Sequence, residues 1–149
     1  MSNETIHILL VDDNPTDLMI MAEAFKSTQL KPILHTAKNG EDAMAFLRHA
    51  HGHVDDPRPD LIILDLNMPR KNGHEVIAEI KSDPVLQRIP VIILTSSLAQ
   101  EDIDRAYAEH ANCYIRKPTD FEDFEKVMAL IERFWFETVT LPAKKHAVF

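Results

Sequence analysis

Short and nearly continuous apolar runs recur along the chain, and after almost every run the apolar residues are spaced as on a helix. Runs of this kind are typical of strands buried on both faces of a parallel sheet. The run Pro32–Ala37 has the weakest pattern. We predict five strands in all: Ile6–Val11, Pro32–Ala37, Leu61–Leu64, Pro90–Leu94 and Cys113–Ile115.

Polar residues with helix-capping chemistry predict where the intervening helices begin. Asn14 precedes Pro15, which is favoured in the first helical turn because its missing N–H costs no hydrogen bond there. Asn39 is expected to cap the second helix. The other three starts have capping-box spacing, the first with Asn in place of Ser or Thr: Asn72–Glu75, Ser97–Gln100 and Thr119–Glu122.

The alternation of strands and helices predicts an α/β domain. Strand–helix pairs in strict order favour a parallel sheet, and right-handed crossovers place helices on both of its faces in a doubly wound arrangement. A length of 149 residues corresponds to about one domain.

Composition excludes several classes of protein. The net charge of −8 disfavours a nucleic-acid binder, which normally carries a basic face. The single cysteine, Cys113, excludes an internal disulfide framework and a cysteine zinc cluster. The first residues lack the basic start and apolar run of a signal peptide, and no apolar stretch approaches the roughly 20 residues that span a bilayer. We therefore expect a soluble cytoplasmic protein that contacts neither membrane nor nucleic acid.

Polar side chains follow four of the five predicted strands. Because the carboxyl ends of parallel strands meet at one edge of a sheet, where ligands bind in such folds, we expect these side chains to converge. They are three carboxylates, two hydroxyls and an ammonium: Asp12, Asp13, Asp65, Thr95, Ser96 and Lys117.

These residue types suit phosphoryl chemistry assisted by a metal ion. Three gathered carboxylates repel one another unless a cation offsets their charge, and oxygen ligands of this kind suit Mg²⁺. Lys117 and Thr95 are donors that can hold phosphoryl oxygens. A carboxylate can itself be the nucleophile and form an aspartyl phosphate.

Two other phosphate-handling classes fit less well. With three glycines in the chain, no glycine-rich loop is available to cradle a dinucleotide or nucleotide phosphate. An aspartyl-phosphatase of the haloacid dehalogenase type places a second Asp two residues after its nucleophile, where this chain has Asn67.

Four motifs together resemble the receiver domain of two-component response regulators: LLVDDN, LDLNMPRKNG, LTSS and YIRKP. The resemblance covers roughly residues 5–136. It implies a flavodoxin-like, five-stranded parallel sheet in the order 2-1-3-4-5 with five helices. Residues 137–149 are then a C-terminal tail, and no output domain is expected.

The resemblance assigns a role to each residue at this edge. Asp65 would be phosphorylated, and Mg²⁺, with Mn²⁺ as a substitute, would be bound by Asp12, Asp13, Asp65 and the backbone carbonyl of Asn67. The phosphoryl-binding and switch residues would be Thr95, Ser96, Tyr114, Lys117 and Pro118, the last joined to Lys117 by a cis peptide bond.

The resemblance also implies partners. A sensor histidine kinase would donate the phosphoryl group to Asp65. The chain would catalyse its own phosphorylation and dephosphorylation without being an enzyme, and would signal to an unknown downstream protein. The segments RIPVIILTSS and NCYI and the apolar ending resemble receivers paired with phytochrome kinases. That ending, with the helix after Ser97, the strand Cys113–Ile115 and the helix after Thr119, is expected to form a homodimer.

Three alternatives stay open. The fold could serve as an interaction module that is never phosphorylated, or the site could belong to a true phosphohydrolase. The histidines His49, His51 and His53 could bind a transition metal if their segment were extended, although a solvated loop is the simpler interpretation.

Overall fold

Five parallel strands form one sheet in the order β2-β1-β3-β4-β5. The computed structural model describes residues 5–49 and 57–142. The strands are β1 (His7–Val11), β2 (Ile33–Ala37), β3 (Leu61–Leu64), β4 (Val91–Thr95) and β5 (Cys113–Arg116). Their order and their positions confirm the predicted sheet, with bounds shifted by one residue at some ends.

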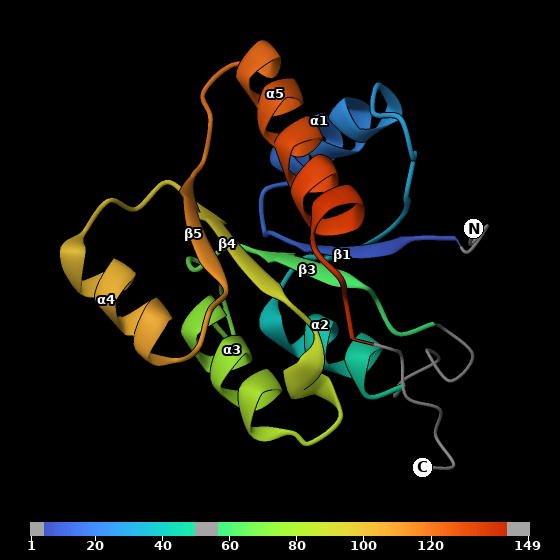
Figure 1. Ribbon diagram of the computed structural model, residues 1–149. Coiled ribbons are helices and arrows are strands. Elements are labelled where there is room, and N and C mark those ends of the chain that lie inside the picture. The colour runs from blue at the N-terminus through green and yellow to red at the C-terminus, as the bar shows by residue number, and fades with distance from the viewer. Residues whose placement is uncertain (1–4, 50–56, 143–149) are drawn as a thin grey trace.

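Helices cover both faces of the sheet (Figure 1). One face carries α1 (Pro15–Lys26) and α5 (Phe121–Glu132), and the other carries α2 (Gly40–Leu47), α3 (Gly73–Ser82) and α4 (Gln100–Ala108). The predicted doubly wound arrangement is therefore confirmed. A short 3-10 turn, Leu86–Arg88, precedes β4, and a π-helical segment, Arg133–Thr138, continues α5.

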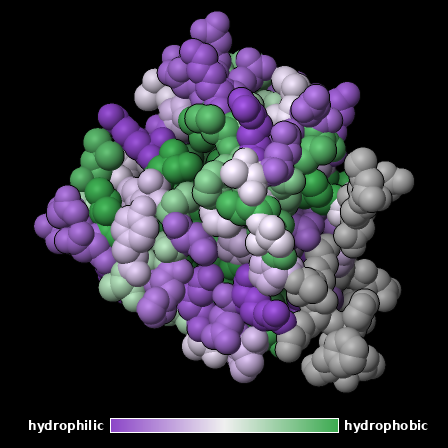
Figure 2. Space-filling model, viewed as in Figure 1, coloured by the Kyte–Doolittle hydropathy of each residue, from purple (hydrophilic) through white to green (hydrophobic). Residues whose placement is uncertain are grey.

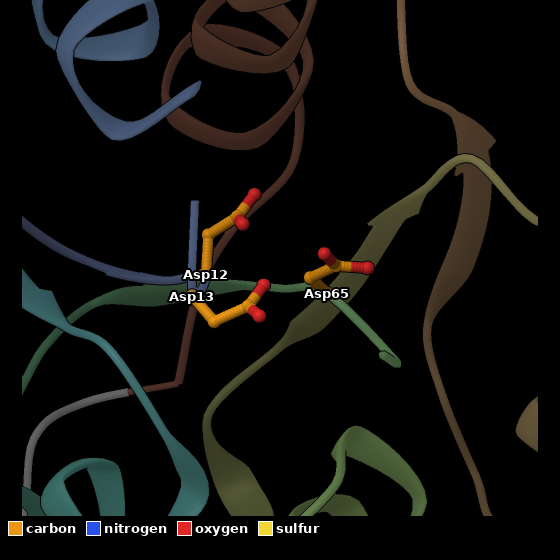
Figure 3. A group of neighbouring side chains, drawn as sticks. All are labelled: Asp12, Asp13 and Asp65. Atoms are coloured by element: carbon orange, nitrogen blue, oxygen red, sulfur yellow. The ribbon is translucent and has the colours of Figure 1, made fainter. Parts of the chain in front are cut away.

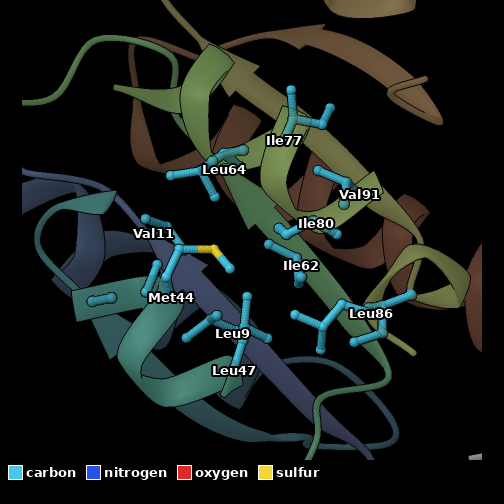
Figure 4. Packing of buried hydrophobic residues seen from close by; sticks show 14 of the residues in the cluster. Leu9, Val11, Met44, Leu47, Ile62, Leu64, Ile77, Ile80, Leu86 and Val91 are labelled. Carbon is cyan, nitrogen blue, oxygen red and sulfur yellow. The ribbon is translucent and has the colours of Figure 1, made fainter. Parts of the chain in front are cut away.

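The central strands are buried on both faces, which explains their continuous apolar runs. In β1, Leu9 packs into the cluster under α2 and α3, while Ile8 packs into the cluster under α1 and α5. Ile62 and Ile63 of β3 divide between the same two clusters. Figure 4 shows the cluster under α2 and α3, which fills the space between the sheet and these helices. Alternate side chains of one strand thus support two separate cores.

Three of the five predicted helix caps are confirmed. The side chain of Asn14 accepts hydrogen bonds from the N–H groups of Thr16 and Asp17, and Asn39 accepts from the N–H of Asp42. Asn72 and Glu75 form the complete capping box, in which each side chain bonds the other residue's backbone.

The other two predicted caps are wrong. The residue before α4 is Ala99, which has no capping side chain, because the Ser97 hydroxyl instead donates to Oδ2 of Asp102 at 2.6 Å. At α5 the cap is Asp120, one residue after the predicted Thr119, and its carboxylate accepts from the backbone of Asp123. Both errors lie where the chain leaves the sheet edge.

The segment after α5 stays helical to Thr138, two residues into the predicted tail. In the part of the chain that the structure describes, no helix is long and apolar enough to cross a membrane. Of the three histidines considered as a metal site, His51 and His53 lie outside the described residues.

Candidate functional site

The sheet's own hydrogen bonds extend one residue past three strands and fix the residues that carry chemistry. The backbone N–H groups of Asp12, Asp65 and Lys117 each donate to the carbonyl of the last residue of a neighbouring strand, at 3.0, 2.9 and 2.7 Å. Each side chain therefore starts from a backbone that the sheet holds rigidly. This explains why residues far apart in the sequence meet at one edge.

Three carboxylates gather at that edge, as the sequence predicts (Figure 3). One oxygen from each of Asp12, Asp13 and Asp65 lies within 4.8 Å of the other two. Asp12 and Asp65 are buried, whereas Asp13 is exposed and leaves the cluster open to solvent. An all-oxygen set of this kind, accessible to water, fits a hard divalent cation such as Mg²⁺ or Mn²⁺.

Lys117 joins the carboxylates through its largely buried ammonium group. Its Nζ donates to Oδ2 of Asp12 at 2.8 Å, to Oδ2 of Asp17 at 2.8 Å and to Oδ2 of Asp65 at 3.2 Å. A lysine has three N–H donors, so all three are used. Asp17 is a site residue that the strand-end pattern missed, since it lies in the first turn of α1.

Burial and hydrogen bonding shift the pKa of Asp12, and also that of Lys117, in opposite directions. Burial raises the pKa of Asp12, although hydrogen bonds from Lys117 and from the N–H of Asn14 partly offset this. For Lys117, burial alone would lower the pKa, but hydrogen bonds to Asp12 and Asp17 outweigh it and raise the pKa above its usual range. Lys117 is therefore protonated, and one ammonium does not fully offset the carboxylates around it. The cluster retains negative charge for a metal ion.

Thr95 presents a buried hydroxyl at the end of β4. Its side chain is fully buried, and Oγ1 has no hydrogen-bond partner among the residues that the structure describes. A buried hydroxyl without a partner costs about 1–3 kcal/mol, so its position at a charged edge indicates a donor kept for a ligand. Ser96, the next residue, is small and exposed.

Tyr114 connects β5 to the loop that follows Thr95. Its hydroxyl donates to the carbonyl of Ser97 at 2.8 Å, and its ring packs partly against the core. Burial raises the pKa of Tyr114, so the hydroxyl keeps its proton as a donor. A change at Thr95 therefore has a direct route to Tyr114 through the β4–α4 loop.

The loop after β3 is packed tightly against the acidic cluster. The N–H of Asn67 points to Oδ1 of Asp65 at 3.4 Å, and the N–H of Gly73 donates to the carbonyl of Leu66 at 2.9 Å. A Cβ atom at Gly73 would lie 2.4 Å from the carbonyl oxygen of Asp65, so only glycine fits there. The carbonyl of Asn67 as a metal ligand stays a prediction.

The prediction of a cis peptide bond between Lys117 and Pro118 is wrong, because no peptide bond in residues 5–49 and 57–142 is cis. The trans form is favoured by about 0.5–1 kcal/mol, and in it Lys117 already reaches all three carboxylates. Burial raises the pKa of Cys113 to about 11, so its thiol stays protonated near neutral pH and is a poor nucleophile.

Comparison with known proteins shows which protein family the chain matches. The response regulator receiver domain model matches residues 8–129. Response regulator Rcp1 of Synechocystis sp. is 45% identical over 142 residues, which is 95% of this chain and 97% of that protein. The probable methanogenesis regulatory protein FilR2 of Methanothrix harundinacea is 37% identical, covering 86% of this chain and 82% of its own length.

Solved structures agree in fold over nearly the same length. The phosphorylated cyanobacterial phytochrome response regulator RcpA superposes with a TM-score of 0.90 at 43% identity, covering 94% of this chain and 100% of that one. The Mn²⁺-bound form of Rcp1 has a TM-score of 0.86 at 45% identity, covering 93% and 99%. With its matched residues, sheet order and acidic edge, this chain belongs to the response regulator receiver domain family.

Proposed function

We propose that this response regulator accepts a phosphoryl group on Asp65 from a sensor histidine kinase, in a reaction that requires a divalent cation. The contact between Lys117 and Asp65, beside the carboxylate cluster and the unpaired Thr95 hydroxyl, is the observation that carries the proposal. A carboxylate oxygen of Asp65 attacks the phosphorus of the phosphohistidine. The new O–P bond forms as the P–N bond breaks, and the imidazole leaves with the bonding electrons.

The residues around Asp65 have separate parts in this transfer. Asp12, Asp13, Asp65 and the carbonyl of Asn67 would hold Mg²⁺, which offsets negative charge on the carboxylates and on the phosphoryl oxygens. Lys117 donates to a phosphoryl oxygen, and so does the Thr95 hydroxyl. The Mn²⁺-bound state of Rcp1 and the phosphorylated state of RcpA support both halves of this assignment.

The same relatives support a phytochrome-type kinase as the donor, because RcpA is named a phytochrome response regulator. We accordingly place the chain in the cytoplasm, together with the kinase that we propose as its donor. Once phosphate binds Thr95, the loop that holds Tyr114 changes, and the face of α4, β5 and α5 presents a new surface to a downstream protein. The phosphate would later leave by hydrolysis that the chain itself catalyses.

Incubation with Mg²⁺ and a small phosphodonor separates the proposed receiver from its alternatives. A receiver accumulates an acyl phosphate that is stable in acid and labile in base. A structural module makes none, and a phosphohydrolase consumes the donor continuously without accumulating product. Asp65→Asn should accumulate no acyl phosphate. Its matched control is Asp104→Asn, which changes an exposed carboxylate on α4 and should behave as the wild-type chain.

A second copy of the chain is the partner that we propose for the apolar face of α4, β5 and α5. Between β5 and α5 lies an apolar hollow, and apolar side chains gather there in Figure 2. Large side chains at its border, on α4 and in the loop before α4 are exposed: Leu130, Phe134, Tyr107 and Leu98. Two identical faces of this kind bury one another's apolar area, which favours association by a two-fold axis.

Replacing Leu130 and Phe134 together with aspartate is expected to convert the dimer to a monomer, because four new charges would be buried at a two-fold interface. Light scattering at a series of protein concentrations measures the mass. Met19→Asp is the control, since Met19 is as exposed as Leu130, at 64% and 63%, and lies on α1, which is not part of the proposed interface. A wild-type chain that is monomeric at all concentrations would contradict the dimer.

A further inference from the structure

Asp17 contacts the site from outside the carboxylate cluster. Its Oδ2 lies 2.8 Å from Nζ of Lys117, as close as the Asp12 oxygen and closer than the Asp65 oxygen at 3.2 Å. The carboxylates within mutual reach of one cation are Asp12, Asp13 and Asp65, and Asp17 is not among them. Asp17 therefore has a polar contact with the site's lysine but no evident share in holding a metal.

The lysine has no donor to spare while Asp17 is bound. Its three N–H groups are matched to three carboxylates, and its side chain is buried. To donate to a phosphoryl oxygen, Lys117 has to give up one of these contacts. The Asp12 side chain is 1% exposed and needs its cation, whereas the Asp17 side chain is 19% exposed and can be hydrated when released. The Asp65 contact, the longest of the three, changes when that carboxylate is phosphorylated, and of the other two the one with Asp17 costs least to break.

We propose that Asp17 is a positioning residue that holds Lys117 in the unphosphorylated state and competes with the phosphoryl group for its ammonium. This inference rests on the proposed phosphorylation of Asp65. The carboxylate of Asp17 also brings a negative charge close to the phosphoryl oxygens, which opposes their binding. Asp17 thus limits how strongly the chain favours its phosphorylated state, without contacting the reacting atoms.

The test measures binding of beryllofluoride, a phosphoryl analogue, at saturating Mg²⁺ by calorimetry and fluorine NMR. Asp17→Asn keeps the shape of the side chain and removes its charge. We expect it to tighten beryllofluoride binding by about fivefold, the scale of one lost charge contact at a partly exposed position. Asp17→Glu keeps the charge and is expected to bind close to the wild-type level.

A charge control and the direction of the change separate this role from a structural one. Glu23→Gln removes one negative charge from the exposed face of the same helix and should leave the affinity unchanged. A residue with only a structural role would weaken binding or leave it unchanged when replaced, so the direction of the change is decisive. Equal or weaker binding by Asp17→Asn, beside normal binding by the wild-type chain, overturns the inference alone. A wild-type chain that binds no beryllofluoride and accepts no phosphate overturns both the inference and the proposed function.

Discussion

Replacing Lys117 with alanine is expected to lower the free energy of unfolding by about 3 kcal/mol, because it removes the ammonium group that three carboxylates share. Asp12 and Asp65 are buried, and Asp17 is largely buried. An ionised carboxylate only accepts hydrogen bonds, so these three side chains cannot bond to one another. Without the ammonium, Asp12 and Asp65 keep the hydrogen bonds from the backbone N–H groups of Asn14 and Asn67 but lose the positive charge that offsets their repulsion. The variant should also lose beryllofluoride binding, since the proposed phosphoryl contact is lost.

Urea unfolding with and without Mg²⁺ measures the first effect. We expect Mg²⁺ to recover part of the lost stability in Lys117→Ala, because the cation offsets the same carboxylates. Lys26→Ala is the matched control, since its ion pair with Glu23 is exposed and is worth at most about 1 kcal/mol. Equal unfolding free energies for the two variants would contradict the account of Lys117 as the centre of a buried charge cluster.

Replacing Gly73 with alanine is expected to destabilise the chain by about 2–3 kcal/mol and to weaken Mg²⁺ binding. The new Cβ would lie 2.4 Å from the carbonyl oxygen of Asp65 and 2.6 Å from Cα of Leu66. Both are backbone atoms directly after β3, so relief of the clash has to displace the residue that we propose as the phosphate acceptor. Stability and metal affinity should therefore fall together.

Urea unfolding and Mg²⁺ titration by calorimetry measure the two effects. Alanine has the higher helix propensity, so propensity alone would make Gly73→Ala stabilising. Ala78→Gly, the reverse change at an exposed position of the same helix, is the control and should cost about 1 kcal/mol without altering metal affinity. A Gly73→Ala chain as stable as the wild type would contradict this prediction, because the loop after β3 would then have moved to admit the new Cβ without cost.

The strands and the site edge were predictable because both depend on local pattern and on topology. A strand buried on both faces has to be apolar throughout, and the carboxyl ends of parallel strands have to share one edge. The run Pro32–Ala37 was weaker for a physical reason. It forms β2 at the edge of the sheet, where Ile33 is exposed and only Ala37 is buried.

What the sequence did not predict depends on how separate elements pack. Asp17 meets Lys117 because the first turn of α1 lies at the same edge of the sheet as the carboxyl end of β5, and no strand-end rule contains that information. Neither does any local pattern show that the buried His74 of α3 contacts Glu109, just after α4, at 2.6 Å. The choice between Thr119 and Asp120 as a helix cap is similar, since both side chains can cap and the path of the loop decides.

The most direct test of the account is to locate the phosphoryl group. The wild-type chain is incubated with Mg²⁺ and phosphoramidate, the acyl phosphate is reduced with borohydride, and the modified residue is identified by tandem mass spectrometry. We predict modification at Asp65 alone, none when Mg²⁺ is chelated, and none in Asp65→Asn. Modification of another residue in the wild-type chain, or none at all with Mg²⁺ present, would contradict the assignment of Asp65 as the phosphate acceptor.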